Sequence, residues 1–94
     1  MAYRLELTKR ARKQLHKMDQ SNALLITRWM RKNLEGCENP RQYGKPLTWD
    51  RLGQWRYRVE EYRIIAEIYD DRVLIMVMTV GHRKEVYDLQ PPIL

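Results

Sequence analysis

The stretch "WRYRVEEYRIIAEIYDD", residues 55–71, decides the predicted fold. Two runs rich in β-branched and aromatic residues, at about 54–59 and 62–69, flank Glu60 and Glu61, which is typical of a β-hairpin. With a two-residue turn, Val59 pairs with Tyr62. One face of the hairpin is then apolar and is expected to join the core; its residues are Tyr57, Val59, Tyr62, Ile64, Ala66 and Ile68.

Three arginines occupy the other face of the predicted hairpin. Arg56 and Arg58 are two residues apart, so their side chains emerge on one side, and the register places Arg58 opposite Arg63. Like charges in direct cross-strand pairs are destabilising. Either this face is solvated and pairs with neighbouring glutamates, or its guanidinium groups bind phosphate oxygens in bidentate fashion. We expect the three side chains to be exposed, on the sheet face turned away from the helices.

Two further strands extend the pattern outward from the hairpin. The run "VLIMVMTV" is apolar on both faces, which predicts a central strand at about 72–80, after a turn at Asp70 and Asp71 and ended by Gly81. Near the N-terminus, "AYRLELT" alternates between apolar and polar residues, which predicts a half-buried strand.

Residues 9–36 predict a helical hairpin. Thr8 is a suitable N-cap for the first helix, whose apolar residues fall on one stripe. The segment Asp19–Asn22 offers a break and a second cap, and Gly36 suits a left-handed C-cap. The segment "CENPRQYGKPLTWDRLGQ", residues 37–54, is punctuated by proline and glycine and is predicted to be a loop.

This order of elements predicts an α+β fold in one domain, residues 1–94: a small antiparallel β-sheet with an N-terminal strand, a two-helix hairpin on one face and a C-terminal three-strand meander. No apolar run approaches the roughly 18 residues of a membrane span, and the first ten residues do not resemble a signal peptide. Cys37 is the only cysteine, which excludes a disulfide framework, and the two histidines form no metal motif. We therefore expect a cytoplasmic protein with no cofactor, no metal and no contact with a membrane.

The formal net charge of +6 suggests a polyanionic partner, either nucleic acid or an acidic protein. Much of this charge lies on the first predicted helix, outside its apolar stripe. These basic residues are Lys9, Arg10, Arg12, Lys13 and Lys17.

The segment "VGHRKEVY", Val80–Tyr87, follows the predicted central strand and carries groups that could transfer protons. His82 is the natural acid or base near neutral pH, although a surface histidine is an equally ordinary reading. Tyr87 could stack on a base, relay a proton or cover the edge of the sheet. The sequence contains no glycine-rich phosphate loop and no order of residues that indicates a Ser-His-Asp triad.

Three segments together, "NPRQYGKPL", "LGQWRYRVEEYRIIAEI" and "VGHRKEVY", resemble the RelE/ParE superfamily of bacterial and archaeal toxins, and specifically its RelE branch. The resemblance covers nearly the whole chain in order and spacing. It implies a small antiparallel sheet that carries a two-helix hairpin. It also implies an mRNA endonuclease that cuts in the ribosomal A site and is held inactive by a RelB-like antitoxin.

The resemblance assigns roles to particular residues. The family's basic pair falls on Arg56 and Arg58, its next arginine on Arg63, its late arginine on Arg83 and its C-terminal tyrosine on Tyr87. Arg58 and Arg63 would hold the scissile phosphate, Arg56 would position the backbone, and Arg83 would stabilise the leaving oxygen. Proton transfer would fall to His82 or Tyr87. The RNA-binding residues of the first helix, which would hold ribosomal RNA, are Lys9, Lys13 and Lys17.

This sequence departs from the family pattern in one respect that affects the chemistry. The best-known members carry lysines where Arg56 and Arg58 stand, and arginine does not release its proton. Two other functions stay open, although the matching positions of Arg56, Arg58, Arg63, Arg83 and Tyr87 favour the nuclease. A ParE-like chain would inhibit DNA gyrase by binding it, and a nuclease-dead module would only bind an antitoxin or nucleic acid.

Overall fold

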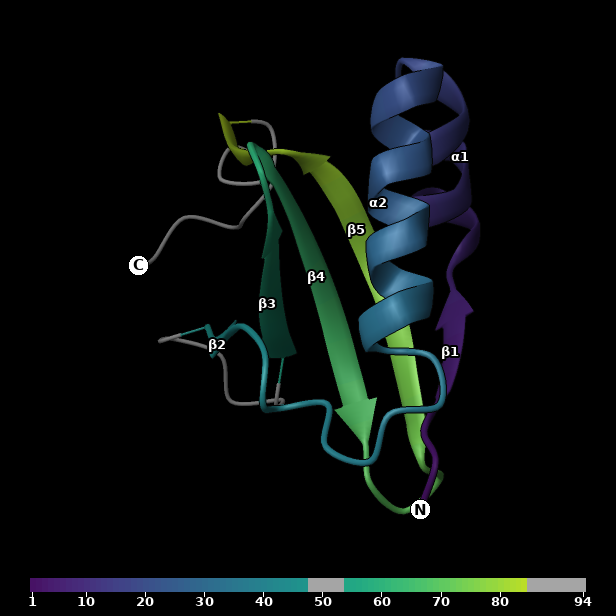
Figure 1. Ribbon diagram of the computed structural model, residues 1–94, viewed down its shortest axis with the longest axis vertical. Coiled ribbons are helices and arrows are strands. Elements are labelled where there is room, and N and C mark those ends of the chain that lie inside the picture. The colour runs from purple at the N-terminus through teal and green to yellow at the C-terminus, as the bar shows by residue number, and fades with distance from the viewer. Residues whose placement is uncertain (48–53, 85–94) are drawn as a thin grey trace.

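The computed structural model describes residues 1–47 and 54–84. Its five-stranded sheet has the order β1-β5-β4-β3-β2 and carries two helices (Figure 1). The strands are β1 (Arg4–Leu7), β2 (Lys45–Pro46), β3 (Gln54–Val59), β4 (Tyr62–Tyr69) and β5 (Leu74–His82). The helices are α1 (Lys9–Lys17) and α2 (Gln20–Asn33). The predicted α+β fold, with its N-terminal strand, helical hairpin and three-strand meander, is confirmed.

The sheet is mixed, because β1 runs parallel to β5 with Arg4 opposite Leu74. The remaining pairs, β2–β3, β3–β4 and β4–β5, are antiparallel. Alternation along the first strand correctly indicates which face is buried, but a period of two carries no information about strand direction. The sequence pattern alone therefore did not reveal the parallel pair.

The central hairpin has the predicted register. Val59 pairs with Tyr62 and Arg58 with Arg63 across the turn at Glu60, whose φ of 55° closes the tight reversal. The second turn is longer than predicted, since Tyr69 pairs with Leu74. β5 also continues through Gly81, which pairs with Arg63, instead of ending there.

Both helices begin at the N-cap residues that the sequence predicts, and the predicted glycine follows the end of α2. The Thr8 hydroxyl accepts from the Ala11 amide at 3.1 Å and donates to the Met78 carbonyl at 3.1 Å, which fixes α1 to β5. A carboxylate oxygen of Asp19 accepts from the Ser21 amide at the start of α2. Gly36 follows α2 with a φ of 78°, a left-handed conformation that glycine adopts without steric cost.

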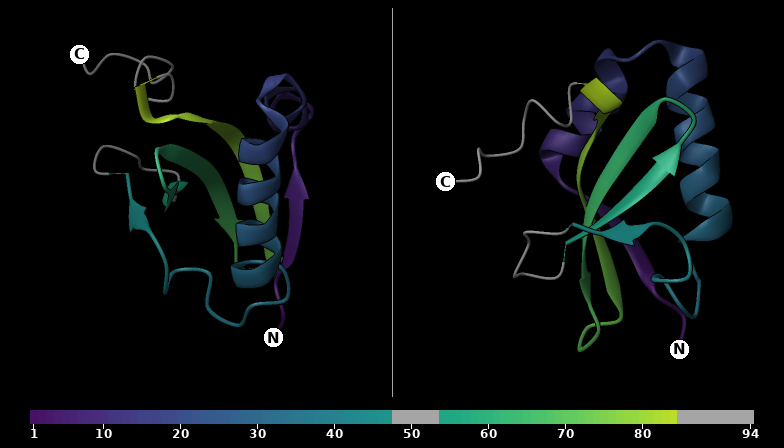
Figure 2. Two further views of the ribbon diagram at one scale, coloured as in Figure 1. Left: turned by 45° about the horizontal axis from the view of Figure 1, so that its top comes forward. Right: turned by 90° about the vertical axis from the view of Figure 1, so that its left-hand side faces the viewer.

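The main core lies between the helices and one face of the sheet. Its fully buried side chains come from both helices, from Leu34 directly after α2, and from β3, β4 and β5. The largest of them are Ile26, Met30, Leu34, Tyr57, Ile64, Ile75, Val77 and Val80. Figure 2 shows the two helices beside β1, with β2 at the distant edge of the sheet. Among the described residues, the opposite face of the sheet carries a small buried cluster of Leu47 and Ile65.

No helix within residues 1–47 and 54–84 has both the length and the apolar character that crossing a membrane requires.

Candidate functional site

Arg56, Arg58 and Arg63 line one pocket, of about 200 Å³, together with Gly44 and Lys45. We call it the arginine pocket. The β3–β4 register places Arg58 beside Arg63 and Arg56 beside Ile65, on the face that does not contact the helices. The prediction that the three arginines share this face is confirmed.

Arg63 is buried, with 7% of its surface exposed, so the expectation that it is an exposed strand charge is wrong. It lies on a central strand, between β3 and β5, whose neighbours cover its aliphatic stem. Its Nη1 donates to the carbonyl of Glu60 at 3.3 Å and to that of Tyr62 at 3.1 Å. These acceptors are neutral, so the guanidinium is held in place without being neutralised.

The neighbouring glutamates do not neutralise the pair formed by Arg58 and Arg63. Glu61 forms an ion pair with Arg83, with its Oε2 at 3.3 Å from Nε. Glu67 accepts from Gln54 at 3.4 Å and from the hydroxyl of Tyr69. Within the described part of the chain, neither Arg58 nor Arg63 has a carboxylate partner. The pocket therefore presents positive charge to an anion, as the phosphate-binding interpretation requires.

Hydrogen bonds from two other parts of the chain anchor the middle of the loop that precedes β2. Asp70 accepts from Arg41 Nη1 and Nη2 at 2.9 and 3.1 Å, and from the Tyr3 hydroxyl at 2.6 Å. The buried Tyr57 hydroxyl donates to the Pro40 carbonyl at 2.6 Å, and burial raises the pKa of this phenol, which stays protonated.

The same loop then approaches the pocket. The indole Nε1 of Trp55 donates to the Tyr43 carbonyl at 2.5 Å. Gly44 follows with a φ of 74°, so close to β3 that a Cβ atom there would lie 2.2 Å from the carbonyl oxygen of Arg56. Lys45 then pairs with Arg56 in the β2–β3 ladder.

The sequence interpretation missed Lys45 because its segment reads as a loop. Only the glycine of "YGKPL" hinted that the backbone passes close to another strand. A two-residue strand is too short to produce an alternating pattern.

Asp70 provides a pH-dependent test of the loop anchor. Hydrogen bonds from Arg41 and Tyr3 lower its pKa below the ordinary value of 3.8. Its stabilising contribution is therefore complete above the unfolded-state pKa and is lost as pH falls through the folded-state pKa. We expect Asp70→Asn to lower the free energy of unfolding at neutral pH by up to about 1 kcal/mol, because a half-exposed pair is screened by solvent.

Denaturant unfolding of wild type and Asp70→Asn at neutral and strongly acidic pH measures this contribution. The two proteins should converge in acid. Asp71→Asn is the matched control, since Asp71 is more exposed and forms a longer ion pair, with Arg72 at 4.0 Å. A difference between wild type and Asp70→Asn that is constant over the whole pH range would contradict the assignment.

Arg83 lies at the end of β5, beside the β3–β4 turn. Its amide donates to the Glu61 carbonyl at 2.8 Å, and its guanidinium is paired with the Glu61 side chain. Arg83 thus lies at the end of the sheet that holds Arg58 and Arg63, but it does not line the arginine pocket.

The structure places His82 on the opposite face of the sheet from the arginines. Because β5 continues through Gly81, His82 pairs with Tyr62, and their rings meet edge to face at 5.8 Å. The expectation that His82 lies beside the arginine cluster is therefore not met. It lines a separate pocket of about 460 Å³ under the helical hairpin, with Gln14, Lys17, Met18, Asp19, Asn22, Tyr62 and Val80.

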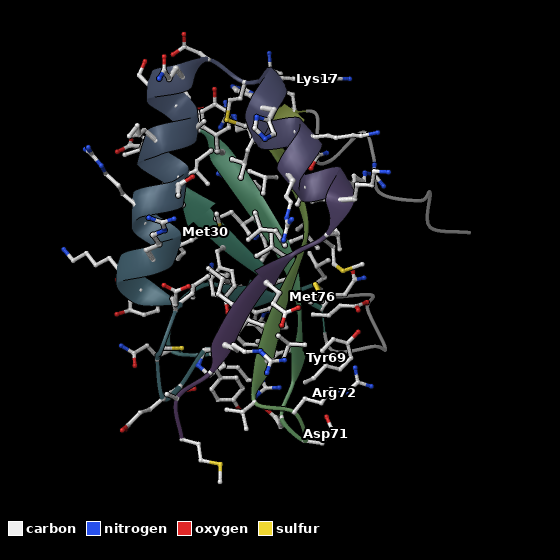
Figure 3. The ribbon with its side chains drawn as sticks, turned by 90° about the vertical axis from the view of Figure 1, so that its right-hand side faces the viewer. Lys17, Met30, Tyr69, Asp71, Arg72 and Met76 are labelled. Carbon is white, nitrogen blue, oxygen red and sulfur yellow. The ribbon has the colours of Figure 1, made fainter. Side chains whose placement is uncertain are left out.

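The other predicted site residues lie elsewhere. Lys9, Lys13 and Lys17 share the exposed face of α1 and, with Arg10 and Gln14, line a further hollow. Figure 3 shows Lys17 at the end of α1, directed away from the protein. Tyr87 lies outside the described residues. Burial raises the pKa of the Cys37 thiol, which opposes formation of a reactive thiolate.

An open sheet with two helices on one face and a cationic pocket on the other is the architecture of small type II toxins. The family model described as "ParE toxin of type II toxin-antitoxin system, parDE" matches residues 5–87, and the chain belongs to the RelE/ParE superfamily, in its RelE branch.

Sequence and structure comparisons give consistent relatives. The chain is 28% identical over 87 residues to "Toxin RelG" of Mycobacterium tuberculosis, a match that covers 93% of this chain and 98% of that protein. The toxin–antitoxin complex RelBE2 of M. tuberculosis contains a chain with 26% identity and a TM-score of 0.78, covering 88% of this chain and 93% of that one. A double arginine-to-alanine variant of Escherichia coli RelE, in the free state, has 25% identity and a TM-score of 0.73, covering 94% and 93%.

Proposed function

We propose that this toxin is a ribosome-dependent mRNA endonuclease that inhibits translation. The observation that carries the proposal is the arginine pocket: Arg58 and Arg63 lie side by side on the sheet face turned away from the helices, and within the described residues neither has a carboxylate partner. Two adjacent guanidinium groups match the non-bridging oxygens of a phosphodiester.

RNA supplies its own nucleophile for this reaction. The 2′-oxygen attacks the adjacent phosphorus, and the bond from phosphorus to the 5′-oxygen breaks. Negative charge accumulates on the non-bridging oxygens during attack, where Arg58 and the fixed guanidinium of Arg63 stabilise it. Arg56 positions the backbone, and Arg83 stabilises the leaving oxygen from the end of β5. Tyr87 keeps the proton-transfer role that the family resemblance assigns to it.

The ribosome supplies substrate alignment that a shallow pocket lacks. A volume of about 200 Å³ is too small to enclose a nucleotide, so the pocket alone would orient RNA poorly. Lys9, Lys13 and Lys17 would contact ribosomal RNA through backbone charge, from a face of α1 separate from the pocket. Phosphate binding and ribosome binding are therefore assigned to different surfaces.

The partner proposed for the resting state is a RelB-like antitoxin. The solved relatives include a toxin–antitoxin complex, RelBE2. An acidic antitoxin segment over the arginine pocket would be electrostatically complementary, which speeds association and prevents RNA from binding.

A single induction experiment tests the proposal. Expression in bacteria should arrest translation and produce cleaved mRNA, and purified toxin should cut mRNA on programmed ribosomes but leave free mRNA nearly intact. The name of the matching family model favours one other function, inhibition of DNA gyrase by a ParE-like toxin. A DNA-damage response without mRNA cleavage would support that function and contradict the nuclease proposal.

A further inference from the structure

Four cationic side chains line the arginine pocket, but only one of them can release a proton. Arginine retains its proton in proteins, so Arg56, Arg58 and Arg63 can stabilise charge without acting as acids. We propose, on the basis of the proposed nuclease function, that Lys45 is the general acid that protonates the 5′-oxygen of the leaving nucleotide.

The sheet register places Lys45 beside the phosphate-binding residues. Lys45 is directly opposite Arg56 in the β2–β3 pair, and directly opposed residues have Cβ atoms about 5 Å apart on the same face. Arg58 follows Arg56 by two residues on that face. Lys45, which is exposed, therefore lines the pocket on the outer edge of the sheet, while Arg63 lines it from the inner strand β4.

The backbone under Lys45 is held more firmly than a surface loop requires. The Tyr57 hydroxyl, the Trp55 indole and the Arg41–Asp70 pair each fix one point of the preceding segment. Gly44 then allows an approach to β3 that any larger residue would obstruct. These restraints hold the backbone of Lys45 in one position. Efficient proton transfer to a bound atom requires a donor that is positioned in this way.

Tyr87 lies outside the described residues, and the two other groups near this end of the sheet, His82 and Arg83, are less well placed to transfer a proton. His82 faces the helical hairpin on the opposite side of the sheet. Arg83 is engaged by Glu61 and, as an arginine, keeps its proton. Among the described residues that line the pocket, Lys45 alone has a proton to give.

The step balances in protons and electrons. The 2′-oxygen forms a bond to phosphorus, and its proton passes to water, directly or through Tyr87 in the proton-transfer role proposed for that residue. The bond between phosphorus and the 5′-oxygen breaks, its electron pair stays on the oxygen, and the Lys45 ammonium transfers a proton there. The products are a 2′,3′-cyclic phosphate and a 5′-hydroxyl, and the amine regains a proton from water.

Lys45→Arg separates charge from proton transfer, because it keeps the positive charge and removes the acid. Single-turnover cleavage on programmed ribosomes should slow by about 100-fold or more in this variant, while ribosome binding stays within about twofold of wild type. Lys32→Arg, on the exposed surface of α2, is the matched control and should cleave at the wild-type rate. A wild-type rate for Lys45→Arg would overturn the assignment.

An mRNA with sulfur in place of the scissile 5′-oxygen provides the decisive measurement, since a thiolate leaves without being protonated. Wild type and Lys45→Arg should cleave this substrate at nearly equal rates. A deficit that persists with sulfur would overturn the acid role, and sulfur rescue of Tyr87→Phe instead of Lys45→Arg would assign the role to Tyr87. If wild type does not cleave the natural substrate, the proposed function itself fails; cleavage by wild type with an unimpaired Lys45→Arg refutes this inference alone.

Discussion

Arg63→Ala is expected to abolish toxicity and to reduce cleavage on programmed ribosomes by about 100- to 1,000-fold, the range for losing one preorganised donor to a developing oxyanion. The reason is the position of Arg63. The residue is buried, its guanidinium is held by the carbonyls of Glu60 and Tyr62, and it pairs across the strands with Arg58. A group that is already immobilised loses little entropy when the phosphate binds, so its removal should affect the transition state more than removal of an exposed cation.

The same burial requires that stability be measured together with activity. Removing a buried side chain with two hydrogen bonds is expected to lower the free energy of unfolding by about 1–3 kcal/mol. Cleavage should therefore be normalised to the folded fraction, obtained from denaturant unfolding. Arg28→Ala, at an exposed site on α2, is the control for loss of a positive charge. A folded Arg63→Ala protein with wild-type cleavage would place the phosphate site elsewhere.

Gly44→Val is expected to reduce cleavage by about 100-fold, although Gly44 itself carries no reactive group. A side chain at this position would place its Cβ atom 2.2 Å from the carbonyl oxygen of Arg56 and 2.9 Å from the indole Nε1 of Trp55. The first of these atoms is backbone, so β2 must move away from β3 and take Lys45 with it. A displacement of about 1 Å is enough to cost on the order of 100-fold in rate.

Gly36→Val is a close control for this experiment. Gly36 has a φ of 78°, nearly the same as Gly44, but no atom lies within 4 Å of the added Cβ position. Both variants therefore carry the strain of a β-branched residue in the left-handed region, and only Gly44→Val carries the clash. Cleavage per folded molecule should be normal in Gly36→Val. Equal losses in the two variants would show that the approach of β2 to β3 does not matter.

The sequence predicts those features that depend on local pattern. The alternation of apolar and polar residues on both sides of the Glu60–Glu61 turn predicts the register that pairs Arg58 with Arg63. The N-cap at Thr8 predicts the start of α1. Features that depend on the neighbours of a strand are not predicted. The burial of Arg63 follows from its place on β4, in the interior of the sheet, and no pattern around Arg63 itself encodes that position.

The interpretation of His82 fails for a related reason. The sequence pattern predicts that the strand ends at Gly81, whereas this glycine continues the ladder opposite Arg63. One additional strand residue reverses the face on which the next side chain lies. The role of Tyr87 rests on the family resemblance, since this residue lies outside the described part of the chain.

The brevity of β2 has a consequence for aggregation. An outer strand offers unpaired amide and carbonyl groups that can recruit a strand from another molecule, and proteins limit this risk with short edges, lysine and proline. β2 consists of Lys45 and Pro46 alone, and a proline has no amide hydrogen to donate outward. The same dipeptide that supplies a cation to the pocket therefore also discourages toxin molecules from joining sheet to sheet along this edge.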